Sequence, residues 1–172
     1  MKKLFAVLFV TMMATCTLFA DTDVVIEPVS DSDFAVTTSD GVSLWLLEDI
    51  DSALAKFDLT FDGIEENPTN PKLDFFSYSN ENIELGRYRA WDGIYSIVLK
   101  NNETHLNRNV RIGDSVEAIY ANYNDVILKT NGRLFLSYAS NDEESSYYFP
   151  VYLFFEIEDG VIEQIVLEAT YD

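Results

Sequence analysis

The chain contains very little cysteine and histidine: Cys16 and His105 are the only ones in 172 residues. A single thiol cannot form an internal disulfide, and these two residues cannot make up a Cys/His zinc site. A hydrolytic triad needs a base beside its nucleophile. His105 lies in a polar stretch and is interpreted as a solvated loop residue. These counts predict no catalytic residues, no metal and no cofactor, and therefore a protein that is not an enzyme.

Basic residues are also scarce, with 11 Lys and Arg against 30 Asp and Glu, for a net charge of −19. This charge repels nucleic acid and anionic lipid, so we exclude both as partners. It favours cationic partners. Asp58-x-Thr60-x-Asp62-Gly63 is similar to the opening of a calcium loop, but Thr69 stands where the bidentate Glu is expected, and we predict an acidic loop without metal. A hydrolase that uses paired carboxylates is a less favoured alternative.

No hydrophobic run is long enough to cross a membrane. Lys2 and Lys3 precede an apolar stretch at 4–13, and small Ala20 makes residues 1–20 a secretory signal peptide cut before Asp21. Its removal takes away two lysines and no acidic residue, which leaves a net charge of −21. The alternative is a lipoprotein signal that ends at a lipidated Cys16, which would anchor the protein to a membrane. We expect a secreted or periplasmic protein.

A set of apolar residues occurs twice. The spacing i, i+3, i+4, i+7 predicts an amphipathic helix at each place. The two helical sets, 66 positions apart, are Ile50, Ala53, Leu54, Phe57 and Val116, Ile119, Tyr120, Tyr123. Segments 75–78 and 91–99 reappear in the same order as 135–138 and 158–167. Ordered matches of this kind indicate a duplicated unit.

The predicted fold class is therefore α+β: two tandem units, each an amphipathic helix packed on an antiparallel β-sheet. The predicted organisation is a signal peptide (1–20), an acidic lead-in (21–41), unit one (42–100), a linker (101–107) and unit two (108–172). Asp114 is the predicted N-cap of the second helix, with Glu117 three residues later. Hairpins are expected at Asp92-Gly93, Asn131-Gly132 and Asp159-Gly160.

The pattern from Val110 to Ser115, followed by a helix, a gap and strand–Asp-Gly–strand, resembles the units of the beta-lactamase inhibitor protein family and of the SmpA/OmlA (BamE-like) lipoproteins. The tandem arrangement is more similar to the inhibitor family. That resemblance implies a concave sheet that grips a protein partner. It differs at Leu47, which stands where the second copy has Gly113, and in the absence of disulfides. A beta-lactamase target does not follow from it.

Alternation along 87–91 places Arg87, Arg89 and Trp91 on one face of a strand. Tyr152 and Phe154 are their counterparts in the second copy, and Leu153, Phe155 and Ile157 face the core. Arg and Trp are enriched at binding hot spots. Cross-strand packing with ordinary salt bridges is the alternative. We therefore expect a protein-binding, inhibitor-like module that uses an open sheet face; an envelope assembly or structural lipoprotein tethered through Cys16 is the second hypothesis.

Overall fold

The computed structural model describes residues 28–123, 127–129, 133–139 and 150–169. Several predictions lie outside these residues. They are the signal peptide, Cys16, residues 21–27 of the acidic lead-in and the turn at Asn131-Gly132. The side chains of 127–129 are also outside the description, although the backbone there forms a strand.

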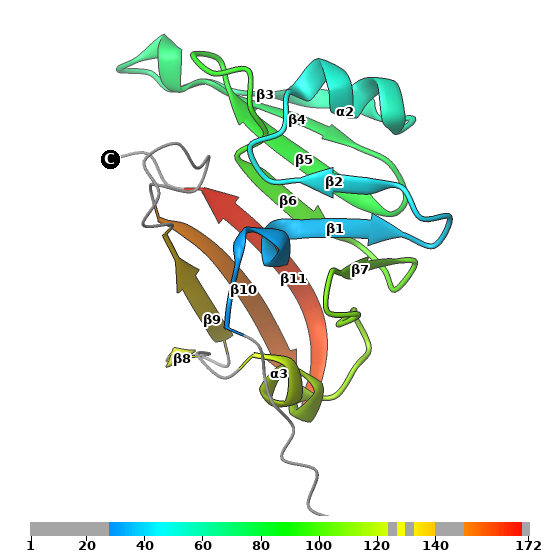
Figure 1. Cartoon of the computed structure of the whole chain (residues 1–172). Coiled ribbons are helices and arrows are strands. Elements are labelled where there is room, and N and C mark those ends of the chain that lie inside the picture. The colour runs from blue at the N-terminus through cyan, green and yellow to red at the C-terminus, as the bar shows by residue number, and fades with distance from the viewer. Residues whose placement is uncertain (1–27, 124–126, 130–132, 140–149, 170–172) are drawn as a thin grey trace, which may run out of the picture.

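Two antiparallel sheets make up the described chain (Figure 1). The large sheet has eight strands. In spatial order they are β3 (Thr60–Glu65), β4 (Phe75–Ser79), β5 (Ile83–Tyr88), β6 (Ser96–Leu99), β11 (Val161–Ala169), β10 (Val151–Glu158), β9 (Arg133–Tyr138) and β8 (Ile127–Lys129). The small sheet has the order β2 (Ser43–Trp45), β1 (Ala35–Thr38) and β7 (Thr104–Leu106).

The predicted fold class, two tandem helix-on-sheet units, is wrong. The described chain is mostly β, and its α-helices α2 (Ile50–Lys56) and α3 (Val116–Asn122) have only seven residues each. A helix of this length spans about 10 Å, too little to cover a sheet. The small sheet supplies the rest of the covering layer. Its strands β1 and β7 come from the stretches predicted as lead-in and linker.

Both helices form where the apolar spacing predicts them. Asp49 caps α2, because its Oδ1 accepts a hydrogen bond from Ser52 N at 2.9 Å. The predicted cap of α3 is wrong: Ser115 is the N-cap residue. Asp114 instead accepts a hydrogen bond from Arg111 N at 3.0 Å, which shapes the turn before the helix.

The segment before each helix is joined to a strand segment by the same backbone hydrogen bonds. Leu47 N donates to Ile94 O at 2.8 Å, and Gly113 N donates to Ile162 O at 2.9 Å. Leu47 and Gly113 both have positive φ, 66° and 90°. The local geometry is thus shared although one residue is leucine and the other glycine.

The hydrophobic core lies between the two layers. In Figure 1 the small sheet and both α-helices lie on the same side of the large sheet. Their buried residues and those of the large sheet form one cluster. Leu153 and Phe155 are fully buried, as predicted, and Ile157 is partly buried against the core. Among the described residues, no other strand and neither α-helix covers the opposite face of the large sheet. We call that face the open face.

A buried ion pair fastens the N-terminal 3-10 helix η1 (Asp31–Phe34) to the end of α3. Arg108 places Nε 2.5 Å from Oδ1 and Nη2 2.7 Å from Oδ2 of Asp33, which is 1% exposed. Arg108 also donates to Asn122 O at 2.6 Å and lies 4.9 Å from the centre of the Tyr123 ring. Burial raises the pKa of Tyr123.

Candidate binding face

Strand register decides which side chains reach the open face. Directly paired residues of antiparallel strands project from the same side of a sheet. Phe75 pairs with Tyr88 at one end of the face. Ser96 pairs with Glu168, and Glu168 pairs with Tyr152. The open face therefore continues from β4 to β10 without interruption, across the junction of β6 with β11.

Two groups of aromatic side chains lie on this face. In the first, the Tyr88 ring centre is 5.2 Å from that of Phe75 and 5.5 Å from those of both Trp91 and Tyr95. These three contacts are edge-to-face, a favourable geometry for aromatic pairs. Trp91 and Tyr95 are 5.4 Å apart. The first aromatic group is thus a connected set of four rings: Phe75, Tyr88, Trp91 and Tyr95.

The second aromatic group consists of Phe135, Tyr152 and Phe154. Tyr152 and Phe154 stack with ring centres 5.8 Å apart, and Phe135 lies 6.1 Å from Phe154 on the neighbouring strand. All three side chains are half-buried. On the core side of β10, Leu153 and Phe155 are fully buried. The half-buried rings therefore lie on the face that the described core does not use.

Tyr152 and Phe154 lie on the open face as predicted, and Trp91 joins it through its contact with Tyr88. The prediction that Arg87 and Arg89 lie on the open face is wrong. Strand β5 begins at Ile83 and ends at Tyr88, so Arg87 projects with the buried Ile83 and Leu85.

Both arginines instead contact Phe76, which pairs with Arg87 on the other side of the sheet. Their Cζ atoms lie 4.9 Å (Arg87) and 5.5 Å (Arg89) from the Phe76 ring centre. Arg87 also donates to Trp91 O at 3.2 Å, and Arg89 pairs with Asp74 at 2.9 Å. The two positive charges are therefore held away from the open face.

A hollow of about 420 Å³ opens beside the first aromatic group. Phe75, Tyr88 and Tyr95 line it, together with Ser96 of β6 and Glu168 of β11. Glu65 and Glu66, at the end of β3, line its far side. The sequence interpretation missed Phe75, Tyr88, Tyr95 and Glu168. The repeated segments 75–78, with its Phe-x-Ser-Tyr pattern, and 91–99 were the available signals.

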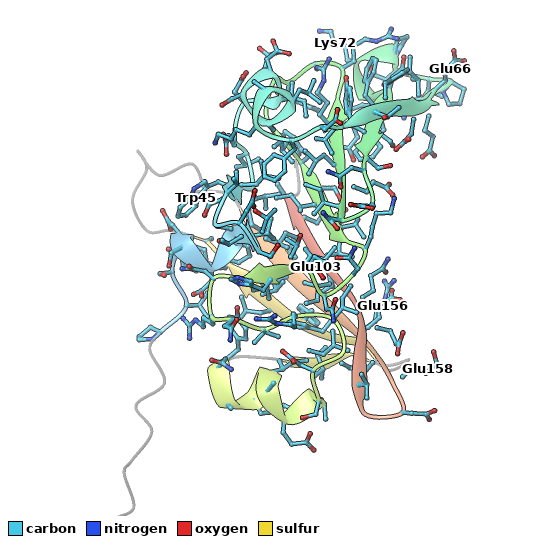
Figure 2. All side chains as sticks on the ribbon, turned by 90° about the vertical axis from the view of Figure 1, so that its right-hand side faces the viewer. Trp45, Glu66, Lys72, Glu103, Glu156 and Glu158 are labelled. Atoms are coloured by element: carbon cyan, nitrogen blue, oxygen red, sulfur yellow. The ribbon has the colours of Figure 1, made fainter. Side chains whose placement is uncertain are left out.

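Negative charge predominates on this side of the molecule. Glu65, Glu66 and Glu168 are exposed and make no ion pair with a described residue. Arg133, the basic residue opposite Glu156, pairs with it. Figure 2 shows Glu66 and Glu156 on the side of the molecule away from Trp45, which lies on the outer side of the small sheet.

The other sequence candidates lie elsewhere. His105 is on β7, where its Nδ1 is 2.9 Å from Leu106 O, a distance at which Nδ1–H donates. The predicted acidic loop at Asp58–Gly63 is wrong, because Thr60–Glu65 forms strand β3. Within the described residues, no three His, Cys, Asp or Glu side chains gather as metal ligands would.

Comparisons of the chain with protein-family models, with curated proteins and with solved structures found no match. Within the described residues, no helix has both the length and the apolar character needed to span a membrane. The chemistry of the open face is therefore the basis for inferring a function.

Proposed function

We propose that the chain is a secreted or periplasmic, non-enzymatic protein that binds a protein partner through the open face. The observation that carries this proposal is the pair of aromatic groups on a sheet face that no other described strand or α-helix covers. Aromatic side chains supply much of the binding energy at protein interfaces, and Tyr and Trp are enriched at hot spots. An aromatic sheet face of this kind fits a protein surface better than a small molecule.

The sequence pattern from Val110 to Ser115 resembles units of the beta-lactamase inhibitor family, which implies a sheet face that grips a partner, but the tandem helix-on-sheet units that the resemblance also implies are not present in the described chain. The composition agrees with this role. A net charge of −21 after signal-peptide removal keeps the protein soluble and attracts cationic surfaces.

Capture of the partner tests the proposal. The chain, as its own cell processes it, is isolated through a C-terminal tag from envelope extract and from culture medium, and co-purifying proteins are identified by mass spectrometry. The test variant is the double substitution Tyr152→Ala with Phe154→Ala, which removes two rings of the second aromatic group. The matched control is Trp45→Ala, which removes an exposed ring from the opposite side of the molecule.

We expect one protein to be retained by the unaltered chain and by Trp45→Ala, and to be lost from the double variant. Truncation of a single hot-spot residue costs about 2 kcal/mol or more, which is about thirtyfold in affinity, and the double variant should lose at least that much. Equal retention by the double variant would contradict the proposal. The thermal midpoint of each variant is measured alongside, so that loss of folding is not mistaken for loss of binding.

A further inference from the structure

We propose that the hollow beside the first aromatic group receives a basic side chain, arginine or lysine, of the bound partner. This inference rests on the proposed function and specifies what the partner's surface must carry. The hollow combines two features that favour a cation: aromatic rings in its wall, and carboxylates at its rim that form no ion pair with a described basic residue.

The aromatic wall is the first feature. Phe75, Tyr88 and Tyr95 line the hollow, and the ring centre of Trp91 lies 5.5 Å from that of Tyr88 and 5.4 Å from that of Tyr95. Aromatic rings attract ammonium and guanidinium groups through their quadrupole, and several rings around one site form the aromatic cages that bind such cations. The same protein already uses this contact internally, with Arg87 over Phe76 and Arg108 over Tyr123.

The carboxylates are the second feature. Glu168 borders the hollow between Ser96 and Tyr152, and Glu65 and Glu66 border the opposite side. No described basic side chain pairs with these three residues. Placing three carboxylates near one hollow without a counter-charge costs electrostatic energy, which an incoming cation would relieve. An anionic side chain would be repelled.

A bare metal ion fits the hollow less well than an organic cation. Hard cations require six or more oxygen ligands converging at short distance, and no group of three candidate ligands was found among the described residues. The three rings in the wall also favour a guanidinium or ammonium group on an apolar stem. Charge complementarity therefore identifies a basic side chain as the occupant.

The test uses two small probes of nearly equal shape, N-acetyl-arginine amide and N-acetyl-citrulline amide. Citrulline replaces the guanidinium with a neutral urea. The protein used starts at Asp21, which retains every residue of the described core. Binding is followed by the backbone amide resonances of Ser96 and Glu168, which line the hollow, with the amide of Trp45 as an internal control on the opposite side.

We expect both the Ser96 and the Glu168 resonance to shift on addition of the arginine probe, while the Trp45 resonance stays in place. The affinity obtained from these shifts should be at least about fivefold higher for the arginine probe than for the citrulline probe. Glu168→Gln should weaken arginine binding about threefold or more and should leave citrulline binding unchanged. The matched control is Glu163→Gln, which removes the same charge from an exposed position of the same strand outside the hollow. It should bind like the unaltered chain.

Equal binding of the two probes, or no binding of either, would overturn the inference. If Glu168→Gln and Glu163→Gln had equal effects, the inference would also be overturned. The attraction would then come from the overall negative charge of the protein and not from a carboxylate at the hollow. The outcomes distinguish a failure of the proposed function from a failure of the inference about the hollow. A partner captured through Tyr152 and Phe154 without arginine-selective binding would leave only the proposed function. Arginine-selective binding without any captured partner would overturn the proposed function instead.

Discussion

The ring of Phe75 lies directly over Gly86 on the neighbouring strand: a Cβ placed at Gly86 would come within 2.0 Å of Phe75 Cζ. The absence of a side chain at Gly86 lets the ring lie flat against the sheet, which buries Gly86 although it faces the open side. This contact fixes the position of Phe75, and through Tyr88 it positions the rest of the first aromatic group.

Gly86→Ala should displace the Phe75 ring and lower the free energy of unfolding by about 1–3 kcal/mol, as overpacking does. Denaturant unfolding measures this loss. In a double-mutant cycle with Phe75→Leu, whose smaller side chain relieves the clash, the two losses should be less than additive. Strictly additive losses would contradict the proposed contact between ring and backbone.

Removing one member of the buried ion pair should be strongly destabilising. Asp33→Asn leaves the guanidinium of Arg108, whose side chain is 16% exposed, without its carboxylate. Loss of one partner of a buried pair costs about 3–5 kcal/mol. The thermal midpoint should fall accordingly.

The control for this prediction removes both charges together. Asp33→Leu with Arg108→Met should be more stable than Asp33→Asn, because no unpaired charge remains. A double variant that is less stable than the single variant would show that the hydrogen bonds of Arg108 to Pro28 O and Asn122 O matter more than the ion pair.

The start of α3 should show a local pH dependence. A hydrogen bond from the Ser115 side chain lowers the pKa of Glu117, the first acidic residue of the helix. A carboxyl whose pKa is depressed by folding stabilises the fold when ionised. Its contribution is complete above the ordinary Glu pKa and is lost as the pH falls through the lowered value.

NMR titration of the Glu117 carboxyl carbon measures this effect. The midpoint should lie below the usual Glu value and should rise toward it in Ser115→Ala. Ser52→Ala, near the start of the other helix, serves as the control and should leave the Glu117 midpoint unchanged. A midpoint unaffected by Ser115→Ala would refute the assigned hydrogen bond.

The mass of the mature N-terminus decides between the two signals considered for the first residues. We expect a free amino terminus at Asp21 from intact-mass spectrometry of protein recovered from the producing cell. A lipid-modified Cys16 would show instead that the protein is tethered to a membrane. A Cys16→Ser variant is the control, because it blocks lipidation without changing cleavage at Ala20.

Local patterns predicted the elements whose partners are close in sequence. The hairpin of β10 and β11 has two long apolar segments joined by an Asp-Gly turn, and both helices show the 3.6-residue period. The small sheet was missed because β1 pairs with β7, nearly seventy residues away, and each strand has only three or four residues. Pairing over such a distance leaves no local pattern in the sequence.

The error at Arg87 and Arg89 has a related cause. The alternation from Arg87 to Trp91 predicts a strand, but β5 lies earlier and ends at Tyr88. Gly86 has no side chain, so it conceals the alternation that the buried Ile83 and Leu85 begin. At Leu47 the sequence shows a departure from Gly113 of the second copy, but Leu47 adopts the positive φ that is more often found for glycine, so the backbone geometry is the same.

Site-specific cross-linking tests the central claim most directly. The photoreactive residue p-benzoylphenylalanine is introduced at Tyr152 on the open face, and in a separate protein at Trp45 on the opposite side. After irradiation of the producing cells, the account predicts a cross-linked partner protein from position 152 and none from position 45. A cross-link from position 45 alone, or none from either position, would contradict the proposal that the open face binds a protein.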